Sequence, residues 1–197
     1  NLAFLGSYVE DQVKLYKNLI HWPDGIFVKN FDSHVRKVPG REIIKNIKVG
    51  SNINQITILG SLPTKSLKYL RKRFKNKIIQ NKDLPYGSIE TIIKKFHYKI
   101  KKDELIFITL PTPKQEQLAE FIIKNNKYYK IICIGGSINM LSGVERQVPD
   151  IFFNIEFIWR LRYETKRRLK RLMITFLQYL KGKYIIRKLN NITIKII

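Results

Sequence analysis

Residues 105–110 read Leu-Ile-Phe-Ile-Thr-Leu and are followed directly by Pro-Thr-Pro-Lys-Gln-Glu at 111–116. An unbroken apolar run of this length, closed by prolines, is typical of a strand that is covered on both faces. Residues 115–124, which come next, have the pattern of a helix. The sequence therefore predicts a strand–loop–helix unit, the repeating part of a parallel α/β sheet.

The same alternation extends to both sides of this unit. Short β-branched or apolar runs predict strands over 55–59, 77–79 and 131–134. Leu67, Leu70 and Phe74 have helical spacing after the first of them, and Ser88 is suited to cap a further helix. Strands and helices in this order predict an α/β fold with a parallel sheet.

Three polar or glycine-containing segments follow predicted strands, at 60–61, 111–116 and 135–137. Ligands of open parallel sheets bind at the carboxyl ends of the strands, so these segments are expected on one rim. A lysine beside a helix N-terminus can hold a phosphate, and adjacent glycines let a ligand approach the backbone. An ordinary polar loop explains 111–116 equally well, and the glycine pair matches neither a dinucleotide fingerprint nor a P-loop.

The chain is strongly basic. Its 197 residues contain 38 Lys and Arg against 15 Asp and Glu, a formal net charge of +23. A hydrophobic content of 44% excludes a disordered basic tail. The charge predicts an anionic partner, for which nucleic acid, an acidic membrane and a phosphorylated substrate are candidates.

The positive charge is concentrated near the C-terminus. Residues 160–188 contain eleven basic side chains and one acid, Glu164, so we place a domain boundary between 1–155 and 156–197. The second part is predicted to be a helical appendage with apolar residues at helical spacing: Phe157, Leu161, Leu169, Leu172, Met173, Phe176, Leu177 and Leu180. A basic amphipathic helix is typical of a membrane-surface element, and a helix packed on its own domain is the alternative.

Other chemistry has less support. The three histidines lack metal-ligand spacing, so no metal site and no cofactor are predicted. The single cysteine, Cys133, lies in an apolar run and is interpreted as a buried hydrophobe. No apolar stretch is long enough to span a bilayer, and no signal peptide is visible, although the chain begins with Asn1 rather than Met. Asp24 lies in a Trp-Pro-Asp-Gly turn, where it either forms the turn or accepts a proton.

Taken together and in order, the motifs resemble those of the WecG/TagA/CpsF family of bacterial glycosyltransferases. The resemblance covers roughly residues 1–172 and is strongest over 113–167. The residues that carry it are Asp24-Gly25, Val38-Pro39-Gly40, Ile58-Leu59-Gly60, Thr112 to Glu116, Gly135-Gly136-Ser137, Leu141-Ser142-Gly143, Arg146-Gln147-Val148-Pro149, Glu156 with Trp159-Arg160-Leu161, and Glu164 with Arg167.

The resemblance implies a Rossmann-like core with a C-terminal appendage. It also implies transfer, with inversion, of an N-acetylmannosamine-type sugar from UDP to an undecaprenyl-diphosphate-linked acceptor in cell-surface polysaccharide synthesis. The UDP-sugar is then a substrate, the partner surface is the anionic cytoplasmic face of the inner membrane, and nucleic acid is not a partner. Whether the chain forms a homo-oligomer is left open.

Residue roles implied by the resemblance fall into three groups. Asp24 takes the position of the proposed catalytic base. The donor-binding positions are Lys114, Gln115, Glu116, Gly135, Gly136 and Ser137. The diphosphate-binding positions are Arg160, Arg167 and Lys170, and no metal is implied.

Some positions depart from the family pattern. The family's threonine upstream of the aspartate has no counterpart, and Asn139, Gln147, Thr165 and Lys170 replace the usual residues. These departures leave open a catalytically degenerate family member. The net charge of +23, together with the aromatic residues, leaves open a basic nucleic-acid-binding module. Neither the aromatic grooves nor the motifs of such modules are evident in the chain.

Overall fold

The computed structural model describes residues 38–146 and, in the C-terminal region, residues 169, 173, 174, 176, 177 and 180. The chain divides into two compact units, one of which comprises Gly40–Gln147 and contains the whole α/β layer structure described below. The predicted domain boundary at 155 lies outside the described residues and stays a prediction.

Four parallel strands form the sheet of this unit: β1 (Gln55–Leu59), β2 (Ile78–Lys82), β3 (Glu104–Ile108) and β4 (Ile131–Cys133). Their order is β2-β1-β3-β4, with Gln55 opposite both Ile78 and Glu104. The predicted α/β class and parallel sheet are confirmed, and the arrangement is Rossmann-like.

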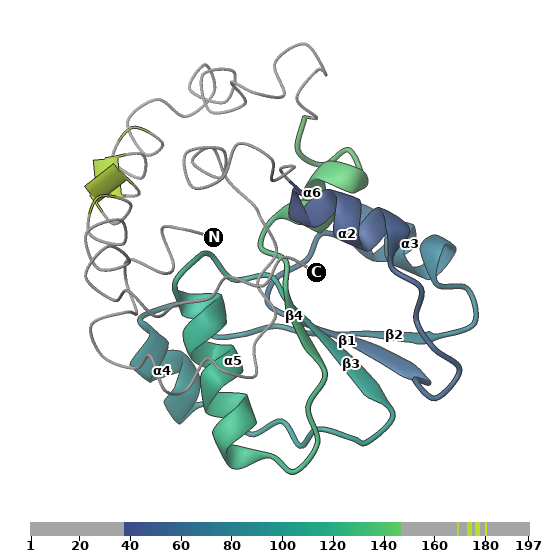
Figure 1. Ribbon diagram of the computed structural model, residues 1–197, viewed down its shortest axis with the longest axis horizontal. Helices are drawn as coiled ribbons and strands as arrows, with labels where there is room; N and C mark the ends of the chain where they lie inside the picture. The colour runs from purple at the N-terminus through teal and green to yellow at the C-terminus, as the bar shows by residue number, and fades with distance from the viewer. Residues whose placement is uncertain (1–37, 147–168, 170–172, 175, 178–179, 181–197) are drawn as a thin grey trace, which may run out of the picture. The chain divides into compact units, whose positions relative to one another are not determined.

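Helices cover both faces of the sheet (Figure 1). One face packs against α2 (Gly40–Asn46), α3 (Thr64–Arg73) and α6 (Ser137–Leu141), and the other against α4 (Ile89–Lys94) and α5 (Lys114–Asn125). Because both faces are covered, all five residues of β1 and of β3 are buried. This explains why β3 appears in the sequence as a continuous apolar run.

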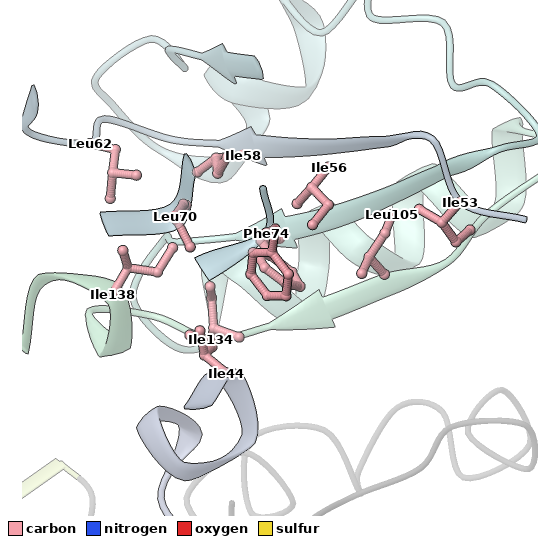
Figure 2. Packing of buried hydrophobic residues seen from close by; sticks show 11 residues of the cluster. Ile44, Ile53, Ile56, Ile58, Leu62, Leu70, Phe74, Leu105, Ile134 and Ile138 are labelled. Atoms are coloured by element: carbon pink, nitrogen blue, oxygen red, sulfur yellow. The ribbon is translucent and has the colours of Figure 1, made fainter. Parts of the chain in front are cut away.

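Alternate residues of each central strand point to opposite helix layers. Ile56, Ile58 and Phe107 pack with the α2–α3–α6 layer, whereas Ile106 and Ile108 pack with the α4–α5 layer. Figure 2 shows the first of these clusters around Phe74, whose ring centroid lies 6.3 Å from that of Phe107. The helices are thus held by residues from two neighbouring strands.

The predicted elements agree with the structure except at their ends. Ser88 caps α4 as expected, accepting a hydrogen bond from the backbone N–H of Thr91 at 3.4 Å. The strand predicted at 77–79 begins at 78 and extends to Lys82, because β1 offers hydrogen-bonding partners along this whole length. The strand predicted at 105–110 is instead Glu104–Ile108. Helices α2 and α6 were not predicted.

Candidate active site

The strand order reverses between β1 and β3, which places a topological switch point at their carboxyl ends. Open α/β sheets bind ligands at such points, because the two following connections leave on opposite faces and open a crevice. Here the connection after β1 begins at Gly60, and the connection after β3 begins at Thr109. The predicted rim therefore coincides with the switch point of the sheet.

Gly60 and Thr109 lie in very close contact. The backbone N–H of Thr109 donates to the carbonyl of Leu59 at 3.0 Å, and the Thr109 hydroxyl donates to the same oxygen at 3.2 Å. A Cβ at position 60 would overlap Thr109 Oγ1, and Gly60 has φ of +127°. Only glycine allows Thr109 Oγ1 to come this close and also adopts this positive φ without strain. The turn that follows β1 therefore requires the glycine at position 60.

The segment after β3 contributes three polar side chains to the rim. Gln115 Nε2 donates to Glu116 Oε1 at 2.7 Å and to Thr112 Oγ1 at 3.1 Å, and the Thr112 hydroxyl donates to Glu116 Oε1 at 3.0 Å. Lys114 points elsewhere, with its Nζ donating to the carbonyl of Gly87 at 2.6 Å. The first turn of α5 is therefore a connected polar network that excludes its lysine.

The glycine turn after β4 joins this network. The backbone N–H of Gly135 donates to Gln115 Oε1 at 3.0 Å, and Gly135 has φ of +52°. Ser137 points away from the network, since its hydroxyl donates to the carbonyl of Ile134 at 2.6 Å and lies against Gly40. The structure thus brings Gln115, Glu116 and Gly135 together and gives Lys114 and Ser137 other partners.

The Glu116 carboxylate on this side of the rim is only partly hydrogen-bonded. Glu116 Oε2 is buried and has no hydrogen-bond donor within the described part of the chain. Burial raises the pKa of the Cys133 thiol well above its ordinary range, and the Glu116 carboxylate adds to this effect. The raised pKa favours the protonated thiol. Cys133 was predicted to be a buried hydrophobe, and in the structure it is a partly buried residue packed against the α4–α5 cluster.

A second polar cluster joins α3 to α6 and was missed at the level of sequence. Ser66 is fully buried, and its hydroxyl contacts Asn139 Oδ1 at 2.8 Å and Ser142 Oγ at 2.7 Å. Lys65 Nζ donates to the carbonyl of Gly143 at 3.2 Å. Asn139 is one of the positions that depart from the family pattern. Its contact with Ser66 shows what that position does in this chain: it holds α6 to α3.

A third polar cluster lies at the opposite, amino ends of the strands. Glu104 is 1% exposed, and its Oε1 accepts hydrogen bonds from Gln55 Nε2 at 3.1 Å, from the Tyr98 hydroxyl at 2.5 Å, and from the Thr57 hydroxyl. Its Oε2 accepts from the backbone N–H of Lys101 at 3.0 Å. The sequence signal for this cluster was weak: polar residues, Gln55 and Thr57, at alternate positions of an otherwise apolar strand.

Gly136 is exposed and is the N-cap residue of α6. The other predicted site residues, Asp24, Arg160, Arg167 and Lys170, lie outside the described residues and stay predictions. In the part of the chain that the structure describes, no group of three or more His, Cys, Asp or Glu side chains is placed to hold a metal ion. Among the same residues, no helix has the length and apolar character needed to cross a membrane.

Comparison with known proteins shows which family shares these motifs. The model of the glycosyl transferase WecG/TagA/CpsF family matches residues 28–191, a range that includes every described element and the predicted diphosphate-binding positions but not Asp24. No solved structure matches the chain significantly.

Curated relatives match half of the chain. A protein of Staphylococcus aureus (strain NCTC 8325 / PS 47), named N-acetylglucosaminyldiphosphoundecaprenol N-acetyl-beta-D-mannosaminyltransferase, is 33% identical over 106 residues, which are 50% of this chain and 40% of the relative. A protein of the same name from strain MRSA252 is 32% identical over an equal length. The match thus spans about two-fifths of the length of these relatives. The family model, in contrast, covers most of the chain, and on this ground the chain belongs to the WecG/TagA/CpsF family of glycosyltransferases.

Proposed function

We propose that this chain transfers an N-acetylmannosamine-type sugar from a UDP donor to an undecaprenyl-diphosphate-linked acceptor in cell-surface polysaccharide synthesis. The observation that carries the proposal is the family match over 28–191, combined with a polar rim at the switch point of the sheet. The names of the Staphylococcus aureus relatives support the sugar and the lipid-linked acceptor.

Asp24 is the proposed base of an inverting transfer. The acceptor hydroxyl oxygen attacks the anomeric carbon while the bond from that carbon to the UDP oxygen breaks. The hydroxyl proton moves to the Asp24 carboxylate, and UDP leaves with an additional negative charge. Without a metal, cationic side chains have to stabilise this charge, a role we assign to Arg160, Arg167 and Lys170.

The basic C-terminal region is the proposed membrane contact, at the cytoplasmic face. Its described residues are helical, and six apolar side chains there are between 46% and 62% exposed: Leu169, Met173, Ile174, Phe176, Leu177 and Leu180. Apolar side chains on a helix rich in Lys and Arg favour binding to an anionic bilayer surface. A lipid-linked acceptor would then be met where it resides.

UDP release from a panel of UDP-sugars, with a lipid-diphosphate-linked N-acetylglucosamine acceptor, tests the reaction. Asp24→Asn is expected to lower turnover roughly 100- to 10,000-fold while UDP affinity stays unchanged. Asp103→Asn is the matched control, because Asp103 binds the Asn54 side chain at the amino ends of the strands, away from the rim. Normal turnover in Asp24→Asn would refute the base assignment, and no turnover by the unmodified chain on any donor would refute the proposed reaction.

Vesicle co-sedimentation tests the membrane contact. The double variant Met173→Asp/Leu177→Asp is expected to reduce binding to anionic vesicles roughly tenfold, because two partly exposed apolar side chains become charged. Removal of residues from 157 onward should lower both binding and activity. Tyr86→Asp is the control, since Tyr86 is 99% exposed but lies in the α/β unit. If the control reduces binding as much as the double variant, or if nucleic acid with a steep salt dependence binds better than vesicles, the proposal is wrong.

A further inference from the structure

The side chain of Gln115 connects the two loops of the rim. It is 8% exposed, and both ends of its amide have partners: Oε1 accepts from the Gly135 N–H, and Nε2 donates to Thr112 and Glu116. A side chain whose amide is fully engaged by protein groups is held in one orientation. Gln115 therefore links the first turn of α5 to the glycine turn that follows β4.

Glu116 determines which way this amide faces. An ionised carboxylate can only accept hydrogen bonds, so Gln115 must present its NH₂ group to Glu116 and its oxygen to Gly135. Thr112 is compatible with this arrangement, since its hydroxyl donates to Glu116 Oε1 at 3.0 Å and accepts from Gln115 at 3.1 Å. A flipped amide would place its NH₂ group against the Gly135 N–H and its oxygen against the carboxylate.

The second carboxylate oxygen strengthens the argument. Glu116 Oε2 is buried without a donor in the described part of the chain, so the hydrogen bonds that this carboxylate accepts there all converge on Oε1. An amide in place of the carboxylate would have no satisfactory orientation. Its NH₂ group would either be buried unpaired at the Oε2 position or face the NH₂ group of Gln115.

We propose that Glu116 is a positioning residue: through Gln115 it holds the Gly135 N–H, and with it the glycine turn of the donor site. That this turn belongs to a donor site rests on the proposed sugar transfer. Gly135 also donates to the carbonyl of Ile108, but at the longer distance of 3.3 Å, so Gln115 is its closer acceptor. A turn held before the substrate arrives binds the donor without first having to be ordered.

The residue pair allows a charge-conserving exchange. Gln115→Glu brings two carboxylates together, and Glu116→Gln replaces a group that can only accept with an amide that can turn its NH₂ group toward Gln115. In the exchanged double variant Gln115→Glu/Glu116→Gln, the carboxylate at 115 replaces the amide oxygen as acceptor of the Gly135 N–H, and the amide at 116 donates to that carboxylate. Gln117→Glu is the control, because it adds one negative charge to the same helix outside the network.

The readout is the hydrogen exchange of the Gly135 amide in the full chain. Ile134-Gly135 is the only Ile-Gly pair among the ten glycines, so carbonyl-¹³C isoleucine with ¹⁵N glycine selects this amide. Gly60 serves as a reference in an ¹⁵N-glycine sample, since its N–H donates to the Lys82 carbonyl at 3.0 Å, outside the network.

We expect Glu116→Gln to accelerate exchange at Gly135 roughly fivefold relative to Gly60, in line with the loss of one hydrogen bond. The exchanged variant should return to within about twofold of the original rate, and Gln117→Glu should change nothing. If Gln115→Glu fails to fold, Glu116→Gln and the exchanged variant still decide the question. Unchanged exchange in Glu116→Gln, or an exchanged variant no better than that single variant, would overturn the proposal.

Kinetics separate this inference from the proposed function. With an active chain, Glu116→Gln should raise the KM for the UDP-sugar more than it lowers kcat, and the exchanged variant should recover part of the loss. An active Glu116→Gln variant with unchanged KM would overturn the positioning role. If the unmodified chain transfers no sugar, the proposed function fails, whereas the exchange experiment still reports on the hydrogen-bond relay.

Discussion

Glu104→Gln is the substitution for which the structure predicts the clearest loss of stability. The carboxylate accepts from three side chains at Oε1 and from the Lys101 N–H at Oε2, and it is 1% exposed. The amide of a glutamine must place its NH₂ group at the position of either Oε1 or Oε2. There the NH₂ group faces a hydrogen-bond donor and cannot accept from it. At least one buried donor then loses its acceptor.

The expected magnitude follows from these contacts. An unsatisfied buried donor costs about 1–3 kcal/mol, and hydrogen bonds to a charged acceptor are about twice as strong as neutral ones. We therefore expect Glu104→Gln to lower the free energy of unfolding by about 2–4 kcal/mol. This is a large part of the 5–15 kcal/mol that is usual for a domain.

Urea unfolding followed by far-ultraviolet circular dichroism measures this loss. Glu120→Gln is the matched control. The Glu120 carboxylate pairs with Lys124 on the surface of α5 at 2.7 Å, an arrangement worth about 0.5 kcal/mol or less. In a double-mutant cycle, Tyr98→Phe and Glu104→Gln should couple by about 1–2 kcal/mol, because their side chains share a hydrogen bond. A loss no larger than that of Glu120→Gln, or no coupling, would refute the reasoning.

Three further predictions concern single residues. Gly60→Ala should destabilise the fold by about 1–3 kcal/mol, because its Cβ overlaps Thr109 Oγ1 at a left-handed backbone angle. Gly50→Ala is the control and should lower the stability less, because its Cβ meets only the flexible Asn52 side chain. Equal urea unfolding midpoints for the two variants would contradict this prediction. Burial and the hydrogen bond to the buried carboxylate raise the pKa of Tyr98. Its folded pKa thus exceeds its unfolded value of about 10, so its contribution to stability is present below that pH and lost as the pH rises through the folded pKa. Tyr98→Phe should reduce the alkaline loss of stability measured between pH 8 and 11, and an identical pH profile would count against it. Iodoacetamide at pH 8 should alkylate Cys133 at least tenfold more slowly in the folded chain than in urea, because burial raises the pKa of its thiol; equal rates would show that the thiol is accessible and ionised.

Periodicity predicted most elements because both faces of the sheet are covered. A strand buried on both faces, such as β3, must be apolar throughout, and its signal is local. The ends of strands are different, because they depend on the partner. Strand β2 extends to Lys82 since β1 pairs with it along five residues, and no local property of Asn81 or Lys82 indicates this.

The candidate site was predictable in position but not in contacts. Strand–loop–helix order is enough to place Gln115 and Gly135 at one rim, because the carboxyl ends of parallel strands share an edge. That Gln115 binds Gly135, whereas Lys114 binds Gly87 and Ser137 turns toward Gly40, depends on side-chain directions that no spacing encodes. The same is true of Glu104, which has the appearance of a surface acid in the sequence.

By itself, then, the sequence determined the α/β class, the sequence of its elements and the resemblance to a glycosyltransferase family, because hydrophobic periodicity and ordered motifs are local properties. Only the tertiary structure decided the strand order β2-β1-β3-β4, the burial of Glu104, and the link from Glu116 through Gln115 to Gly135. These features join residues that are up to 49 positions apart, and they arise from strand register and from the exclusion of water around polar groups.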